Sequence, residues 1–317
     1  MLLDEPGTSS SDPDDVLPEA LSDQAVTRLG DVWVLGNHRL ICADATSERS
    51  YAALLGSERA EMAFTDPPYN VAIGGHVTSR GRHREFVMAS GEMSPAQFRG
   101  FLESVFRLMA RFSLPASIQF TCMDWAHLRE ILVAGDAAFS ELKNLITWVK
   151  PNAGMGSFYR SQHELILAWK SGKGRHINNF GLGESGRYRS NVWHYAGVNG
   201  FRRGRDEDLA DHPTVKPTAL VADAIRDCSH RGGLILDPFV GSGTTILAAE
   251  RTGRAARAIE IDPLYCDVAI RRWQERTKRK AQLLGSSQPF DQVAEARNDA
   301  SKTVTQRVRR RRAAHVE

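Results

Sequence analysis

The chain has 317 residues, of which 42% are apolar and 25% charged, which is typical of a globular protein with a sizeable core. Its four cysteines are widely separated and form no CxxC pair or His/Cys cluster, which argues against a zinc site and against a secreted disulfide framework. No segment is apolar over the length of a signal core or membrane span, so the sequence predicts a soluble cytoplasmic protein.

The net charge of +3 hides an uneven distribution. Residues 1–31 contain eight acidic residues and one basic residue, which leaves 40 basic against 30 acidic residues in the rest of the chain. A basic body behind an acidic arm indicates a polyanionic partner.

Apolar runs alternate with helical patterns along the chain. We expect strands at 32–36, 39–44, 60–66, 116–122, 144–150, 163–170, 233–239 and 254–262. We expect helices at 47–55, 94–112, 128–135, 217–230 and 244–252, and a last amphipathic helix through Trp273. This alternation predicts an α/β fold in which a mostly parallel, twisted sheet is covered by helices on both faces.

The patterns also predict domain boundaries. Residues 1–27 are acidic and rich in turn formers, so we expect a disordered arm there. The folded domain is expected at 28–275, with an interruption at about 171–208 where Gly, Arg and aromatic residues replace the apolar pattern. Residues 276–317 are expected to form a polar, basic tail that includes RVRRRR at 307–312.

One candidate site follows the strand predicted at 60–66, which runs into TDPPY (65–69). Two consecutive prolines end a strand because neither has an N–H for the ladder. Asp66 and Tyr69 are then held rigidly at the strand's carboxyl end, where ligands bind in open α/β sheets.

A second candidate is the glycine turn LDPFVGSGTT (236–245), which lies between a strand and a helix. Gly241 and Gly243 permit close ligand approach, and Thr244 or Thr245 is the expected N-cap of the helix. A turn of this kind fits either a nucleoside-containing cofactor or a tight structural connection. The missing third glycine and the missing GK[ST] sequence disfavour NAD and nucleoside triphosphates. Glu260 lies 21 positions after Phe239, near the offset of about twenty at which an acid binds ribose hydroxyls.

Together, DPPY at 66–69 and DPFVGSG at 237–243 closely resemble the motifs of DNA amino-methyltransferases, which methylate adenine N6 or cytosine N4. The segments DHPTVKP (211–217), WVKP (148–151), YRSQHE (159–164) and RLICADAT (39–46) also resemble that family, so the likeness covers about residues 28–275. The catalytic motif precedes the cofactor motif, as in the circularly permuted beta class. The stretch GDVWVLGNHRLICADAT also resembles the methylase portion of larger proteins with a ParB-like N-terminal domain.

The resemblance implies a Rossmann-like methyltransferase fold that binds S-adenosyl-L-methionine, and it implies roles for individual residues. The implied catalytic residues are Asp66, Pro67, Pro68 and Tyr69. The implied cofactor-binding residues are Asp44, Ala45, Asp66, Lys216, Asp237, Phe239, Gly241, Ser242, Gly243, Thr244, Glu260 and Ile261. Lys216 is expected either near the cofactor's carboxylate or as a surface lysine at a helix start. His163 and Glu164 are expected to be structural, and the cysteines to lie in the core.

In the implied mechanism, the Asp66 carboxylate and the Pro67 carbonyl accept hydrogen bonds from the target amine, and no metal is required. Tyr69 stacks on the target base, which must leave the duplex to be reached. Double-stranded DNA is the expected partner. The basic loop at 70–93 is expected to close over the base, and phosphate contacts are expected from Arg187, Arg189, Arg202, Arg203 and Arg205.

Several alternatives stay open at this point. Adenine N6 is the preferred target because the cytosine-N4 group's motif often begins with Ser rather than Asp; an RNA target is a rarer case. A non-catalytic DNA-binding protein on the same scaffold and an NAD-dependent oxidoreductase are alternatives from other classes. The sequence leaves open the recognition site, a cognate restriction enzyme and the oligomeric state, a homodimer included.

Overall fold

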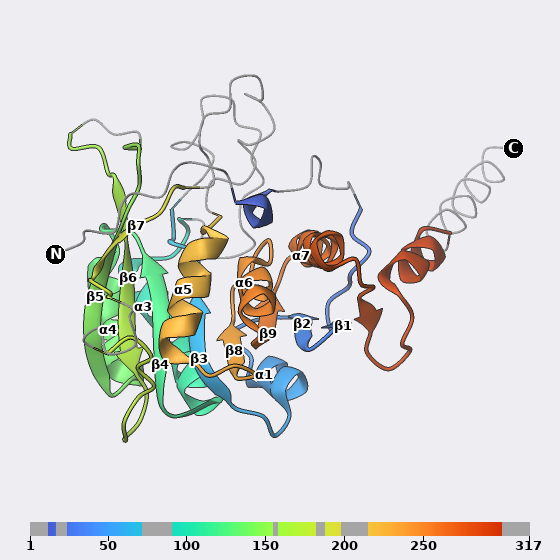
Figure 1. The fold of residues 1–317 in the computed structure, drawn as a ribbon, viewed down its shortest axis with the longest axis horizontal. Helices are drawn as coiled ribbons and strands as arrows, with labels where there is room; N and C mark the ends of the chain where they lie inside the picture. The colour runs from blue at the N-terminus through green and yellow to red at the C-terminus, as the bar shows by residue number, and fades with distance from the viewer. Residues whose placement is uncertain are drawn as a thin grey trace, which may run out of the picture.

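A single mixed β-sheet runs through the described part of the chain, with helices packed on both of its faces (Figure 1). The computed structural model describes residues 12–16, 24–71, 91–154, 158–181, 188–197 and 215–299. Within these residues the sheet has ten strands. In sheet order they are β10 (Gln282–Leu283), β1 (Val32–Leu35), β2 (His38–Cys42), β9 (Ala255–Glu260), β8 (Leu234–Asp237), β3 (Ala60–Thr65), β4 (Ser113–Met123), β6 (His163–Lys170), β5 (Glu141–Val149) and β7 (Val192–His194).

Five neighbouring strands, from β2 to β4, run parallel and form the centre of the sheet. The short strand β1 pairs antiparallel with β2 on one side. On the other side β6 is reversed and pairs antiparallel with both β4 and β5. The expected α/β fold with a mostly parallel sheet is therefore confirmed. Strand β7 was not expected, because it lies in the stretch at 171–208 where the apolar pattern ends.

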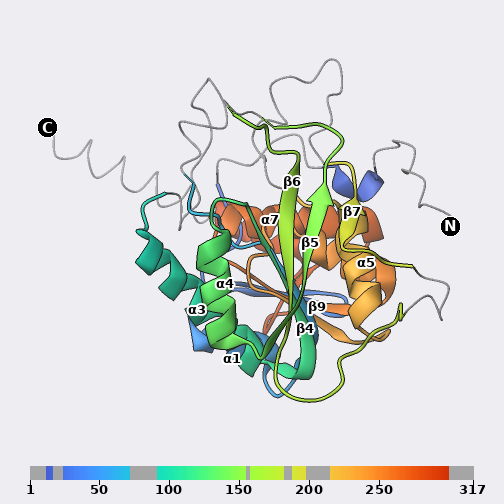
Figure 2. The ribbon, with the colours of Figure 1, turned by 90° about the vertical axis from the view of Figure 1, so that its left-hand side faces the viewer.

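Two sets of helices cover the two faces of the sheet (Figure 2). One set packs its apolar residues into the same core cluster and comprises α1 (Glu48–Leu55), α3 (Pro95–Arg111) and α4 (Leu128–Ala138). The other set comprises α5 (Thr218–Cys228), α6 (Thr244–Thr252) and α7 (Pro263–Thr277). All four cysteines are buried and free, as expected. None of the helices in the described ranges is long and apolar enough to cross a membrane.

Helix α3 shows how local sequence fixes an element. Ser94 is its N-cap and forms a reciprocal capping box with Gln97, and Pro95 follows at the first helical position. Buried residues Phe98, Leu102 and Val105 recur at helical spacing and face the core. The helix begins and ends within one residue of the predicted limits.

Part of the N-terminal arm is bound to the folded body, contrary to the expectation of disorder over 1–27. Residues Pro13–Asp15 form a 3-10 turn, η1, and the Asp14 side chain forms an ion pair with Arg276 at 2.5 Å. Further along, the backbone N–H of Val26 donates to the Asp267 carboxylate at 2.6 Å. Contacts with α7 therefore hold both described pieces of the arm.

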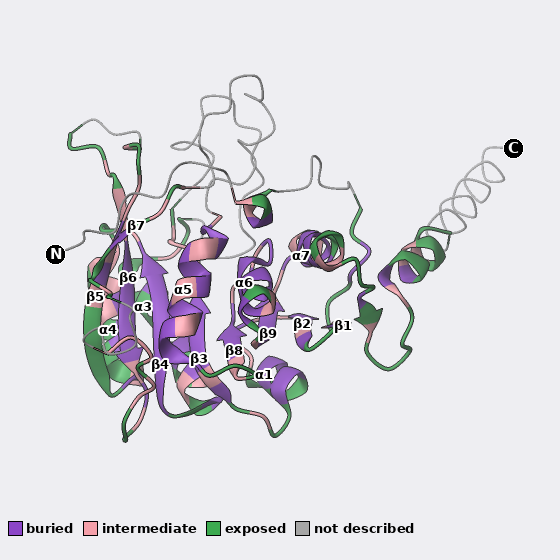
Figure 3. Ribbon diagram, viewed as in Figure 1, coloured by how far each residue is buried: buried purple, intermediate pink, exposed green. Residues whose placement is uncertain are grey.

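The folded body also continues beyond residue 275, where the sequence analysis places its end. Strand β10 pairs with β1, and residues 290–299 are helical with one buried face (Figure 3). The Phe290 ring packs edge-on against Trp33 with a centroid distance of 5.2 Å. The polar tail is thus shorter than predicted, and RVRRRR at 307–312 lies outside the described residues.

Candidate active site

Both candidate motifs lie at the carboxyl edge of the parallel strands. Strand β3 ends immediately before Asp66, and its neighbour β8 ends at Asp237. The Thr65 hydroxyl donates to the Asp237 carboxylate at 2.9 Å, which links the two motifs across 172 positions of sequence. The expected convergence of these two regions is therefore present in the fold.

The Asp66 carboxylate is held from two sides. Its Oδ2 accepts a hydrogen bond from the Lys216 ammonium at 2.5 Å, and its Oδ1 accepts one from the Tyr69 hydroxyl at 2.8 Å. Burial raises the pKa of Asp66, and the positive charge of Lys216 opposes that rise. Each carboxylate oxygen still has a second lone pair, so Asp66 can accept a further hydrogen bond from a ligand.

Lys216 is not a surface lysine, since only 5% of its side chain is exposed. Besides Asp66, its ammonium contacts Glu164 Oε2 at 3.0 Å and the Tyr69 hydroxyl at 3.2 Å. Burial alone would lower the pKa of Lys216, but Asp66 and Glu164 raise it above its ordinary value, so this lysine is charged.

Glu164 joins the same cluster, although the sequence analysis favours a structural role for it. The Tyr69 hydroxyl lies 3.1 Å from Glu164 Oε2, and Lys150 forms an ion pair with Oε1. Burial would raise the pKa of Glu164, but Lys216 and Lys150 lower it to about 2. The one signal in the sequence is an acidic residue at the start of the otherwise apolar run ELILAW (164–169).

The glycine turn connects β8 to α6. Gly241 and Gly243 both have positive φ angles, 52° and 94°. A Cβ on Gly243 would lie 2.8 Å from the Cβ of Ala269, whereas a Cβ on Gly241 would meet nothing within 4 Å. Gly243 is therefore required by helix packing, and Gly241 leaves open space beside the turn.

The expected N-cap of α6 is wrong: Gly243 occupies that position. Thr244 is buried at the start of the helix, and the Thr245 hydroxyl donates to Asp237 at 2.6 Å instead of capping. Burial raises the pKa of Asp237 to about 6 despite this hydrogen bond. Ser242 is held by the buried Arg272, whose guanidinium donates to the serine carbonyl and hydroxyl at 2.7 and 2.9 Å.

Glu260 ends β9 beside the glycine turn. Its Oε2 accepts from the Gly241 N–H at 2.9 Å and its Oε1 from the Asp262 N–H at 2.8 Å. Burial raises the pKa of Glu260 to about 7, although these backbone donors oppose the rise. An ionised carboxylate at this place could still accept hydrogen bonds from ligand hydroxyl groups.

The remaining candidate cofactor residues lie around this edge. Strand β2 pairs with β9 so that Cys42 lies opposite Glu260, and the Ala43 N–H, one residue before Asp44, donates to the Glu260 carbonyl at 2.9 Å. The Asp44 Oδ1 accepts from the Thr46 N–H and hydroxyl at 2.7 and 2.8 Å. On the other side of the turn, the half-buried Phe239 packs against Phe101 at a centroid distance of 5.8 Å.

A family model named N6_N4_Mtase and described as DNA methylase matches residues 60–271, which is more than half of the chain. The chain belongs to the N6/N4 DNA methylase family. It is 28% identical over 225 residues to the type II methyltransferase M2.DpnII of Streptococcus pneumoniae, a match that covers 68% of this chain and 82% of that protein.

Two solved structures share the fold of this DNA methylase. The M1.HpyAVI–SAM complex covers 74% of this chain and 97% of its own, with a TM-score of 0.54 and 21% identity. The cytosine-N4-specific PvuII DNA methyltransferase covers 83% of this chain and 92% of its own, with a TM-score of 0.56 and 16% identity. The expected methyltransferase fold is therefore confirmed, and the expectation of S-adenosylmethionine agrees with the family.

The acceptor groups at this edge fit such a cofactor. Glu260 could accept hydrogen bonds from ribose hydroxyls, the open space beside Gly241 could admit a ligand against the main chain, and the Asp44 carboxylate could accept a further hydrogen bond. The described residues contain no cluster of His, Cys, Asp and Glu that could hold a metal ion.

Of the five arginines proposed for DNA contact, the structure describes only Arg189. Its guanidinium pairs with Asp227 at 2.9 Å and lies over the Trp193 ring at 4.6 Å, and only 15% of its side chain is exposed. The structure thus engages Arg189 inside the protein rather than presenting it to a phosphate. Arg187, Arg202, Arg203 and Arg205 lie outside the described residues, as does most of the loop at 70–93.

Three exposed aromatic residues lie at the carboxyl edge, and the sequence patterns do not identify them as site residues. Trp125 follows the end of β4 and is 65% exposed. Phe158 and Tyr159 lie between β5 and β6, are 85% and 87% exposed, and hold their rings 4.4 Å apart. Their signal in sequence is weak, because aromatic residues in loops are common.

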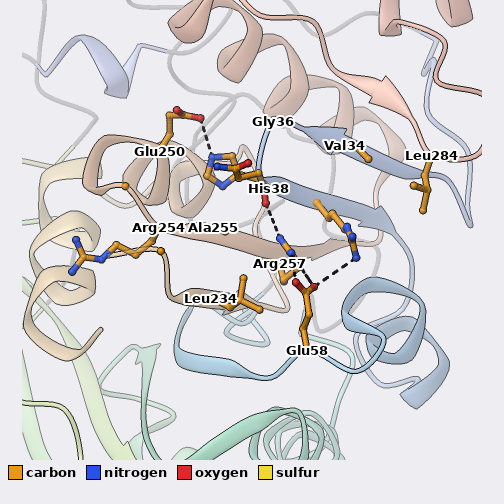
Figure 4. A pocket seen from close by; sticks show the side chains of 14 residues that line it. Val34, Gly36, His38, Glu58, Leu234, Glu250, Arg254, Ala255, Arg257 and Leu284 are labelled. Carbon is orange, nitrogen blue, oxygen red and sulfur yellow. Dashed lines mark hydrogen bonds and ion pairs between the residues drawn. The ribbon is translucent and has the colours of Figure 1, made fainter. Parts of the chain in front are cut away.

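A cavity of about 640 Å³ lies at the opposite edge of the sheet, where β8 and β9 begin (Figure 4). Several of its charged groups pair with one another: Arg257 pairs with Glu58 at 2.9 Å, and His38 lies 3.0 Å from Glu250. The backbone N–H of Ala256 donates to Nδ1 of His38, so Nε2 carries the proton that faces Glu250. This cavity is separate from the active-site edge.

Proposed function

We propose that this DNA methylase transfers a methyl group from S-adenosylmethionine to the exocyclic N6 amine of adenine in double-stranded DNA. The observation that carries the proposal is the Asp66 carboxylate, fixed by Lys216 and Tyr69 beside the β8 end and the glycine turn. Asp66, rather than Ser, begins the DPPY motif, which favours adenine over cytosine.

The cofactor supplies an electrophilic methyl group on a sulfonium, and the protein's task is to prepare the amine. An adenine amine is a poor nucleophile because its lone pair is delocalised into the ring. Hydrogen bonds from its two N–H groups to the Asp66 carboxylate and the Pro67 carbonyl favour a more tetrahedral nitrogen with a directed lone pair. As the bond to carbon forms, the nitrogen gains positive charge, which the Asp66 carboxylate stabilises before it accepts the departing proton.

DNA contact is part of the same proposal. The exposed rings of Trp125, Phe158 and Tyr159 are suited to stacking on bases near the active-site edge. Phosphate binding by Arg187, Arg202, Arg203 and Arg205 and base stacking by Tyr69 stay predictions. Cytosine N4 is the second candidate, because the same two acceptors can hold its amine, and the cytosine-N4-specific PvuII enzyme has the same fold.

The direct test is incubation of the full chain with methyl-labelled S-adenosylmethionine and unmethylated DNA. Digestion to nucleosides and mass spectrometry then distinguish N6-methyladenine from N4-methylcytosine. We expect labelled N6-methyladenine; labelled N4-methylcytosine alone would replace adenine with the second candidate.

The Asp66→Ala variant should bind the cofactor but lose at least about 10²–10³-fold in transfer rate, because one of the two preorganised amine acceptors is removed. Asp136→Ala, the same substitution at an exposed position of α4, should keep full activity. Equal rates for the two variants would remove Asp66 from the mechanism.

A further inference from the structure

Lys216 has no hydrogen-bonding capacity left for a cofactor. An ammonium carries three N–H donors. The Lys216 ammonium has three acceptors, namely Asp66 Oδ2 at 2.5 Å, Glu164 Oε2 at 3.0 Å and the Tyr69 hydroxyl at 3.2 Å. With 5% of its side chain exposed, it would have to give up a buried partner to bind a cofactor carboxylate.

Glu164 completes a charge-balanced cluster around Asp66. Two anions, Asp66 and Glu164, alternate with two cations, Lys216 and Lys150. The Tyr69 hydroxyl has one proton to donate and lies between the two carboxylates, 2.8 Å from Asp66 and 3.1 Å from Glu164. Each member therefore fixes the position of another, and within the described residues the hydrogen bonds that connect Glu164 to Asp66 pass through Lys216 and Tyr69.

We propose that Lys216 and Glu164 are positioning residues for methyl transfer. Lys216 orients Asp66 and keeps it ionised, and Glu164 holds Lys216 in place and partly offsets the effect of its positive charge on Asp66. This inference rests on the proposed function of Asp66 as the acceptor of the target amine. It replaces the expected contact between Lys216 and the cofactor's carboxylate. It also gives the reversed strand β6, which begins with His163 and Glu164, a role at the active-site edge.

The two residues act on Asp66 with opposite signs. Lys216 lowers the pKa of Asp66 against the effect of burial, and Glu164 raises it. Of the other groups that face Asp66, burial raises the pKa of Tyr69 and of Cys122 on β4, so both stay neutral near pH 7. Asp237 on β8 has a pKa of about 6 and interacts with Asp66. Its influence is the same in every variant that leaves it in place, so a difference between variants reports Lys216 and Glu164.

The test is the pH dependence of kcat for Lys216→Met and Glu164→Gln in the full chain. Loss of the cation should move the acidic limb of the profile by about one pH unit to higher pH, and loss of the Glu164 charge should move it to lower pH. Lys170→Met and Glu141→Gln are matched controls. This ion pair, 2.9 Å apart, joins β6 to β5 at the end of β6 that lies farthest from Glu164. The controls should leave the limb in place.

Cofactor affinity separates positioning from direct cofactor binding. In Lys216→Met, calorimetry should give a Kd for S-adenosylmethionine within about threefold of the wild-type value, while kcat at its optimum falls by about 10–100-fold as Asp66 loses its fixed position. A Kd raised tenfold or more with an unmoved pH limb would overturn the inference and return Lys216 to the cofactor. Glu164→Gln keeps the shape of the side chain, so its downward shift tests the inference even if Lys216→Met does not fold.

A readout without turnover keeps this inference distinct from the proposed function. The carboxyl carbon of Asp66 can be followed by NMR in protein labelled with [γ-¹³C]aspartate, assigned through Asp66→Asn. Its titration should shift upward in Lys216→Met and downward in Glu164→Gln. Movement in one direction for both variants, or none, would refute the inference even for an active enzyme. Opposite movements in a protein that methylates no DNA would refute only the proposed function.

Discussion

Glu164, Asp237 and Glu260 are buried carboxyl groups near Asp66 and the glycine turn, and they fall into two classes that reflect their local partners. Glu164 faces two lysines, and its pKa is lowered to about 2, so it is a permanent anion. Among the described residues Asp237 and Glu260 have no lysine or arginine partner, and burial raises their pKa values to about 6 and 7. Glu164 pairs with Lys216, which contacts Asp66, whereas an ionised Glu260 could accept hydrogen bonds from a ligand.

The expected contact between Glu260 and the ribose hydroxyls of the cofactor can be tested through its pH dependence. Because the ionised carboxylate is the better acceptor for ribose hydroxyls, affinity for S-adenosylmethionine should fall as pH decreases through about 7. Glu260→Gln should lose most of this dependence and bind about 10–100-fold more weakly at pH 8, since hydrogen bonds to a charged group contribute roughly 1.5–3 kcal/mol. Calorimetry between pH 5.5 and 8.5 measures both effects. Glu275→Gln, an exposed change on α7, is the control, and a wild-type pH profile in Glu260→Gln would exclude the ribose role.

At the scale of elements, the short turn η1 connects the arm to both halves of the active site. Asp15 accepts a hydrogen bond from the Thr218 N–H at 2.8 Å, which supplies the cap that Pro217 cannot give to α5. Lys216 lies two residues before that capped N–H. The carbonyl of Asp14 accepts from Arg272, the residue that also holds Ser242 in the glycine turn.

Removal of the Asp15 cap should lower the stability of the protein measurably. Asp15→Ala leaves the first N–H of α5 without its acceptor, so we expect the free energy of unfolding to fall by about 1 kcal/mol. Asp291→Ala provides the comparison, because Asp291 and its partner Lys280 are more than half exposed and such pairs contribute about 0–1 kcal/mol. Urea denaturation of the wild-type protein and both variants measures the two changes in the free energy of unfolding. An effect of Asp15→Ala no larger than that of Asp291→Ala would mean that the Asp15 cap does not stabilise α5.

Elements encoded by local signals were predictable, and those defined by distant partners were not. The capping box and apolar spacing of α3 are contained in the sequence of that helix, as are the prolines that end β3. The role of Glu164 depends on the reversal of β6, which no local pattern reveals. The expectation that Arg189 contacts DNA rests on its Arg- and aromatic-rich stretch, and no local pattern reveals its partner Asp227, 38 positions later in sequence.

At the scale of the whole molecule, both ends of the described chain are part of the core. Val26 near the start and Phe290 and Val293 near the end belong to the same buried cluster as α5, α6 and α7. The segment 281–299 covers the outer side of β1. The polar composition of this segment does not indicate that it packs against the sheet.

Phe290 tests whether this segment belongs to the cooperative unit. The side chain is 2% exposed and lies against Trp33, so Phe290→Ala should lower the free energy of unfolding by about 3–5 kcal/mol, through lost burial and the cavity left behind. Leu284→Ala, a truncation in the same segment at a position 53% exposed, should change it by no more than about 0.5 kcal/mol. Urea unfolding followed by both tryptophan fluorescence and circular dichroism measures the difference. A loss below about 1 kcal/mol in Phe290→Ala would show that residues 281–299 detach before the sheet unfolds, because an element outside the cooperative unit cannot transmit its packing energy to it.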